Sequence, residues 1–123
     1  MTVTVAQKKR IIARDGGFCL LALNVCTGEA QTTDHRANRG SGGAGDRLDH
    51  PANLIAACSL CNGAKAEAHG VTRLDLIERG LIVIPDSTHE KTLHRAMETP
   101  VMALDGRLFR LTGFDTREQV TPA

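Results

Sequence analysis

The stretch CSLCNGAK, residues 58–65, holds two cysteines separated by two residues. This C-x2-C spacing lets two thiolates bind one tetrahedral metal ion, while neighbouring backbone N–H groups point at the sulfur atoms. Cys19 and Cys26 lie upstream and can supply the remaining ligands, although the spacing within this first pair is wider than usual. The sequence therefore predicts a structural Zn²⁺ ion bound by Cys19, Cys26, Cys58 and Cys61.

The composition suits one small domain that needs such a metal. The 123 residues are 41% hydrophobic and 24% charged, and they include three Phe but no Trp or Tyr. Without large aromatic anchors, a small core is often supplemented by a metal or by disulfides. No apolar run is long enough to span a membrane, and the N-terminal residues lack the apolar segment of a secretory signal. We therefore expect a protein of the reducing cytoplasm, where paired cysteines favour metal binding; a redox C-x2-C motif and free core cysteines are the alternatives.

Asp34 and His35 place an acid directly before a histidine in TTDHRANRG, residues 32–40. Taken alone, the pair is more typical of a polar turn than of a reactive site. Asn53 in PANLIAAC and Asn62 in CNGAK follow it along the chain. The order of the cysteines, the acid–histidine pair and the two asparagines is more specific than any one of these elements.

The segments RDGGFC, DH, N and CSLCNGAK, within residues 14–65, resemble the HNH endonucleases in their cysteine-flanked form. That form is common in bacteria and phages, and this variant has Asn as its last signature residue. The resemblance implies a ββα-metal core. Its hairpin would carry Asp34 and His35 in or near the first strand and Asn53 in the second, and its helix would start near Asn62.

The same resemblance implies a role for each signature residue. His35 matches the general base, and a neutral imidazole can accept a proton from water near neutral pH. Asn53 matches the residue that orients this histidine through the intervening loop. Asp34 and Asn62 match the ligands of a catalytic Mg²⁺ or Mn²⁺ ion, which prefers carboxylate and amide oxygens. The zinc would be a separate ion with no chemical duty.

Basic residues around the motif are predicted to contact nucleic acid. Lys65 matches a basic residue that usually follows the motif, where it contacts phosphate or packs. A glycine-rich insertion at residues 40–45 lengthens the loop between His35 and Asn53. Such a loop can help to straddle a DNA groove through backbone phosphate contacts. The residues predicted to bind nucleic acid are Arg36, Arg39, Arg47 and Lys65.

Several residues have plainer interpretations that stay open. Asn62 is also favourable as a helix cap, and Asn53 follows Pro51 as a turn residue would. His50 and His69 lie near the motif and are alternative ligands. His50 is more typical of a loop, and His69 of a helix end.

We expect one α+β domain with two parts. Residues 1–70 form the HNH core with an N-terminal helix that ends at residues 15–17, and residues 71–123 extend the same domain. In the extension, RLDLIERG and HEKTLHRAMET are predicted helices, LIVIP a buried strand, and Asp105-Gly106 the turn of a C-terminal hairpin. Residues 18–31 are predicted to form a short strand and a turn.

The function expected from the resemblance is metal-dependent hydrolysis of DNA, with double-stranded DNA favoured, within a larger phage or bacterial DNA-processing complex. Residues 1–65 hold eight Lys/Arg against five Asp/Glu, whereas residues 66–123 hold seven against nine. Anion binding is therefore expected in the first half. The scarcity of aromatic residues argues against stacking on single strands. A non-catalytic zinc-stabilised nucleic-acid-binding module and a zinc-bound docking domain are the alternatives.

Overall fold

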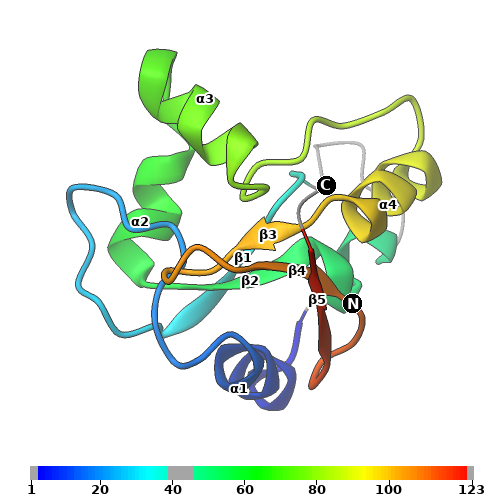
Figure 1. Cartoon of the computed structure of the whole chain (residues 1–123), viewed down its shortest axis with the longest axis horizontal. Helices are drawn as coiled ribbons and strands as arrows, with labels where there is room; N and C mark the ends of the chain where they lie inside the picture. Colours follow the sequence, from blue (N-terminus) through cyan, green and yellow to red (C-terminus); the bar gives the residue numbers. More distant parts are fainter. Residues whose placement is uncertain (1–2, 39–45, 122–123) are drawn as a thin grey trace.

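The computed structural model describes residues 3–38 and 46–121 and shows a mixed α+β protein. In this part of the chain, four α-helices surround an antiparallel strand pair and a separate three-stranded sheet (Figure 1). The helices are α1 (Val5–Arg14), α2 (Ser59–Lys65), α3 (Gly70–Glu78) and α4 (His89–Glu98), with 3-10 turns η1 (Arg47–Asp49) and η2 (Pro51–Asn53). The strands are β1 (Thr32–His35), β2 (Leu54–Ala57), β3 (Val101–Met102), β4 (Leu108–Leu111) and β5 (Arg117–Val120).

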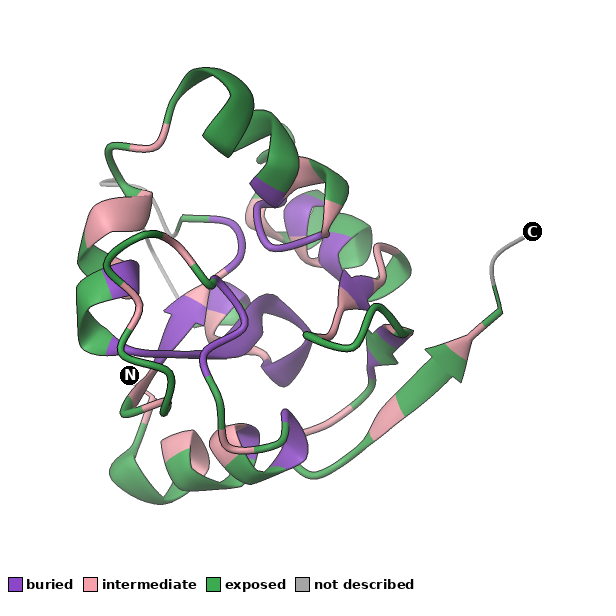
Figure 2. Cartoon of the chain, turned by 60° about the vertical axis from the view of Figure 1, so that its left-hand side comes forward, coloured by how far each residue is buried: buried purple, intermediate pink, exposed green. Residues whose placement is uncertain are grey.

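Strand β2 lies at the centre of the molecule. It pairs with β1 in antiparallel register, with Asp34 opposite Ile55 and His35 opposite Leu54. All four of its residues are buried (Figure 2), as expected of a strand that is covered on both faces. Its second edge is also occupied, because the Ala56 N–H donates to the Asp15 carboxylate at 2.9 Å and the Ala56 carbonyl accepts from the Leu20 N–H at 3.1 Å.

The segment RDGG, residues 14–17, attaches α1 to this strand. The buried guanidinium of Arg14 pairs with Asp15, at 2.8 Å between Nε and Oδ1, and also donates to the carbonyls of Pro51, Leu54 and Gly113. The helix ends at Arg14, directly before the end predicted at residues 15–17. Arg14 and Asp15 therefore join the first helix to β2 and to the turn before β5.

Helix α2 follows β2 after a single residue. Cys58 is its N-cap, and the Cys58 sulfur accepts a hydrogen bond from the Cys61 N–H. The helix thus begins before Asn62, and Asn62 lies inside it, so the helix-cap interpretation of Asn62 is wrong. The chain order in this region is β1, then η1 and η2, then β2 and α2.

The C-terminal part contains the predicted helices and hairpin. Helix α3 is followed by Gly80 with φ of 74°, where a Cβ atom would lie 2.0 Å from the Pro100 carbonyl oxygen, so only glycine fits. Strands β3 and β4 pair around the Asp105-Gly106 turn, which confirms the hairpin. Strand β5 adds a third strand that the sequence analysis missed.

Two predicted strands are absent from the structure. Residues 81–85 are irregular although Leu81, Ile82 and Val83 are buried, because the Leu81 and Ile82 N–H groups cap α3 at the Leu76 carbonyl. Residues 18–31 form a loop with one isolated bridge, between Phe18 and Glu29. Apolar runs this short indicate burial but do not distinguish a strand from buried coil.

One hydrophobic cluster draws on both parts of the chain. It includes Leu20 and Ile55 from the first part and Leu76, Val101 and Phe109 from the second. Among the described residues, no helix has the length and apolar character required to cross a membrane.

Candidate functional site

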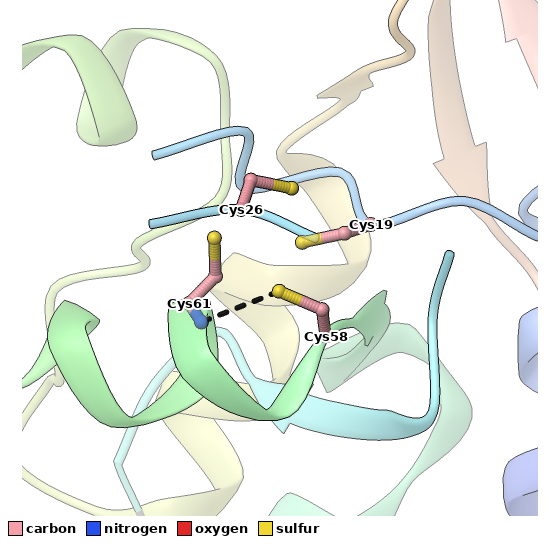
Figure 3. Close-up of side chains that lie close together, drawn as sticks. All are labelled: Cys19, Cys26, Cys58 and Cys61. Carbon is pink, nitrogen blue, oxygen red and sulfur yellow. Dashed lines mark hydrogen bonds between the residues drawn. The ribbon is translucent and has the colours of Figure 1, made fainter. Parts of the chain in front are cut away.

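Four thiols from two distant segments meet at one point. Cys19 and Cys26 come from the loop after α1, while Cys58 and Cys61 come from the start of α2, and all four side chains converge (Figure 3). Their sulfur atoms lie within 4.8 Å of one another and form no disulfide. A tetrahedral Zn²⁺ with Zn–S bonds of about 2.3 Å requires S–S separations of about 3.8 Å. The four cysteines thus lie close enough to bind a metal, and the wide spacing of the first pair does not prevent it.

The surroundings of the thiols are suited to a cation. Cys19, Cys58 and Cys61 are buried in the hydrophobic cluster, and burial raises the pKa of Cys19 and Cys61. Burial also opposes ionisation of Cys58, but hydrogen bonds from Thr27 and Cys61 outweigh it and lower the Cys58 pKa to about 6. Each pair has a backbone N–H donor to sulfur at 3.4 Å, Gly28 to Cys26 and Cys61 to Cys58. A bound dication would supply the charge needed to keep all four thiolates ionised.

Asp34 forms an ion pair with Lys65. The Lys65 ammonium at the end of α2 donates to the Asp34 carboxylate at 2.5 Å and to the His35 carbonyl at 2.7 Å. Burial raises the pKa of Asp34 despite the nearby Lys65, and burial lowers the pKa of Lys65 despite the nearby Asp34. Desolvation is the main cause of both pKa shifts, so a cation next to Asp34 is poorly hydrated.

A pocket of about 190 Å³ opens at this ion pair. Asp34 from β1 and Asn62 from α2 both line it, so the structure brings together the two residues that the resemblance assigns to a catalytic ion. Lys65 and Arg73 add positive charge to the same walls. The other lining residues are Arg36, Asn38, Ala66, Ile82, Val83 and Pro85.

Asn53 fixes the connection between the two central strands. Its buried amide accepts from the Ala37 N–H at 2.9 Å and donates to the carbonyls of Ala37 and Leu48 at 3.0 and 2.9 Å. Its own carbonyl accepts from the Arg36 N–H at 2.7 Å. Asn53 therefore holds Ala37, after β1, and Leu48, in η1, close together. Through Ala37 and Arg36 it can influence the position of His35.

His35 does not line the pocket of Asp34 and Asn62. Its Nε2 atom lies 2.7 Å from the Asp49 carboxylate of η1, and its side chain is 25% exposed. Successive side chains of a strand point to opposite faces, which explains why Asp34 and His35 diverge. The two remain neighbours at the end of β1.

The alternative histidines are not placed with Asp34. His50 Nδ1 accepts from the Ala52 N–H at 3.0 Å and so caps η2, and burial lowers the pKa of His50. His69 precedes α3, with Nδ1 3.0 Å from the Glu67 carbonyl oxygen. Neither residue lines the pocket, so both fit local structural roles better than ligation.

The prediction that Arg36 contacts nucleic acid is wrong. Arg36 is 1% exposed, and its guanidinium donates at 2.6 to 2.8 Å to four backbone carbonyls. Burial is the main cause that lowers the pKa of Arg36 to about 9, so the group keeps its charge at neutral pH. The accepting residues are Ala52, Gly80, Ala96 and Thr99.

The remaining basic residues of the motif differ in placement. Arg47 is exposed and forms an ion pair with Glu90 at 2.9 Å. Arg39 and the glycine-rich residues 40–45 lie outside the described residues. Lys65 is committed to Asp34 and the His35 carbonyl, although it still borders the pocket.

Sequence reasoning missed two residues of this region, Asp49 and Arg73. Asp49 lies 14 residues from His35, and Arg73 lies on a helix outside the motif, so no local spacing linked them to the site. The chain matches no protein-family model, and neither the curated proteins nor the solved structures include a significant match to it.

Proposed function

We propose that the protein is a metal-dependent endonuclease of the HNH type that hydrolyses DNA phosphodiester bonds. The observation that carries the proposal is the shared pocket of Asp34 and Asn62, one from the strand that also bears His35 and one from the helix that begins at the C-x2-C pair. The strand, strand, helix order of β1, β2 and α2 and the four-cysteine cluster support it. In the proposal, the cysteines bind a structural Zn²⁺.

Each residue of the candidate site has a separate role in the proposed hydrolysis. His35 removes a proton from water, the water oxygen bonds to phosphorus, and the bond to the leaving oxygen breaks. Asp34 and Asn62 offer the hard oxygen ligands that Mg²⁺ or Mn²⁺ prefers. When bound, such an ion offsets the negative charge of the phosphate. Asn53 keeps the connection around His35 in place, while Lys65 and Arg73 favour an anion at the pocket.

A second candidate is a zinc-stabilised module that binds nucleic acid without cleaving it. The observation in its favour is the Lys65–Asp34 ion pair, which already supplies a cation to the carboxylate that a nuclease needs for its metal. The His35 side chain, moreover, does not line that pocket. Binding without metal-dependent cleavage is the expected behaviour of such a module.

Cleavage of supercoiled plasmid separates the two candidates. Zinc-loaded protein is incubated with Mg²⁺, with Mn²⁺ and with EDTA, next to His35→Ala and a matched His69→Ala control. We expect nicked or linear DNA from the wild type and from His69→Ala only with a divalent ion. His35→Ala should lose at least about a hundredfold in rate, the lower range for a general base. Circular dichroism and zinc analysis of the protein in EDTA show whether the fold survives the chelator. Equal cleavage by His35→Ala, or none by folded wild type, contradicts the nuclease.

Arg73 provides a separate prediction for DNA binding. It lines the pocket, it is exposed, and its side chain forms no ion pair or hydrogen bond with another described residue. If it contacts one phosphate, Arg73→Ala should weaken binding of short duplexes. The slope of log K against log salt should then fall in magnitude by about 0.9. Fluorescence anisotropy in the His35→Ala background avoids cleavage during the measurement.

The control for this measurement is Arg110→Ala, which removes an exposed arginine that pairs with Glu118 on the C-terminal sheet. Its salt slope should match that of the parent protein. The same loss of slope in both variants would mean that Arg73 acts only through the net charge of the protein.

A further inference from the structure

The contact between His35 and Asp49 links the end of β1 to η1. Nε2 of His35 lies 2.7 Å from Oδ1 of Asp49, and the two side chains are only 25% and 10% exposed. A salt bridge on an open surface is mobile and contributes little. This pair is partly buried and short, so it restrains the imidazole ring.

The carboxylate determines which ring nitrogen carries the proton. An ionised carboxylate only accepts hydrogen bonds, so the nitrogen that faces Asp49 has to be the donor. In the neutral ring, a proton on Nε2 leaves Nδ1 with the free electron pair. Asp49 therefore selects the tautomer in which Nδ1, rather than Nε2, can accept a proton.

The position of Asp49 is itself fixed by the surrounding fold. Leu48, its neighbour in η1, is buried, and the Leu48 carbonyl accepts from the Asn53 side chain at 2.9 Å. The Asp49 N–H closes the turn by donating to the Asp46 carbonyl at 3.0 Å. Helix α4 packs against both η1 and η2. These contacts hold η1 in place, and η1 presents the carboxylate to His35.

Resting on the proposed nuclease function, we propose that Asp49 is the positioning residue of the histidine base. Asp49 holds Nε2–H, and Nδ1 takes the proton from water as the water oxygen bonds to phosphorus. The phosphorus–oxygen bond to the leaving group breaks, and the departing oxygen takes a proton from solvent. The imidazolium that forms keeps its Nε2–H bond to the Asp49 carboxylate, which stabilises its charge. Asn53 then acts on the histidine indirectly, by holding η1.

The first test reads the tautomer in the free protein and needs no substrate. The 13.2 kDa chain contains five histidines, so selective ¹⁵N-histidine labelling with His35→Ala for assignment is practical. At a pH where the ring is neutral, we expect a pyrrole-like Nε2 and a pyridine-like Nδ1 for His35. Asp49→Asn should shift His35 toward a tautomer mixture. A wild-type His35 protonated on Nδ1 would overturn the inference.

The second test separates positioning from stability. Loss of a partner that orients a metal-ligating histidine costs about 10- to 100-fold, and by analogy we expect Asp49→Asn to lower kcat within that range and to change KM by less than about twofold. Asp46→Asn is the matched control, because it removes the same charge from the exposed start of the same turn. It should retain wild-type kcat and the wild-type tautomer.

The outcomes distinguish the inference from the proposed function. If folded wild type cleaves no DNA, the nuclease proposal fails whatever the tautomer. If wild type cleaves and Asp49→Asn keeps its kcat, only the role of Asp49 fails. A loss of kcat shared equally by Asp46→Asn would also overturn it, because the effect would then come from charge alone.

Discussion

Replacement of Cys61 by Ser is expected to release the proposed zinc ion and to unfold most of the protein at room temperature. Cys61 is fully buried and belongs to the hydrophobic cluster that also contains Cys19 and Cys58. Zinc binding contributes about 10–16 kcal/mol to the folding free energy of small zinc peptides. This is as much as the whole unfolding free energy of a typical domain, about 5–15 kcal/mol. Far-UV circular dichroism with elemental analysis of zinc measures both effects.

Ser59→Ala is the matched control for this prediction. Ser59 lies between the two cysteines of the same motif, is exposed, and offers no thiolate. This variant should keep its zinc and a melting temperature close to that of the wild type. A wild-type protein without zinc, whose melting temperature a strong chelator leaves unchanged, would show that the cysteines are only core residues.

Replacement of Arg36 by Met is expected to cost about 3–5 kcal/mol of unfolding free energy. Met retains most of the aliphatic volume but leaves the four carbonyl acceptors of the guanidinium without their donor. Each buried acceptor left without a donor costs about 1–3 kcal/mol, and loss of the buried positive charge offsets part of the sum over the four carbonyls. Urea unfolding gives the free energy if the slope against denaturant concentration stays constant.

The comparison variant for Arg36 is Arg110→Met, which removes an exposed arginine from β4. We expect it to change the unfolding free energy by no more than about 0.5 kcal/mol. Equal midpoints for the two variants would mean that the buried hydrogen bonds of Arg36 have no net effect. The same pair tests whether Arg36 contacts DNA, because a DNA-contact residue at position 36 would affect binding rather than folding.

Local chemistry explains which features the sequence predicts well. The C-x2-C spacing of Cys58 and Cys61, taken with Cys19 and Cys26, predicts four thiols at one site. Their sulfur atoms do lie close together. The end of α1 and the Asp105-Gly106 hairpin follow from turn residues acting on their immediate neighbours. For α1 and the hairpin, the signal lies within a few residues of the feature, whereas the four cysteines come from two distant segments of the chain.

Features that depend on distant packing were not predictable in the same way. Arg36 resembles a solvent-exposed phosphate contact in its local sequence, yet its acceptors include residues 44, 60 and 63 positions away. The contact of Asp49 with His35 likewise depends on how η1 folds back. Strand β5 has mostly polar residues and forms by pairing with β4. Its sequence therefore lacks the apolar pattern that would predict a strand.

For the candidate site, the sequence predicts which residues gather but not how their side chains are directed. Asp34 and Asn62 share a pocket, as the resemblance implies, while His35 faces Asp49. The direction depends on the strand register, in which His35 pairs with Leu54 and Asp34 with Ile55. The catalytic metal, the DNA substrate and the division of the chain at residue 70 stay predictions.

The buried position of Arg36 also limits how the motif can be transplanted. A fragment that ends at residue 70 would keep the Ala52 acceptor of Arg36 but lose those on Gly80, Ala96 and Thr99. It would also lose Leu76, Val101 and Phe109 from the hydrophobic cluster. Grafting residues 14–65 onto another scaffold would therefore carry a charged side chain into an interior that cannot satisfy it. The module that can be moved as a unit extends at least to Leu111.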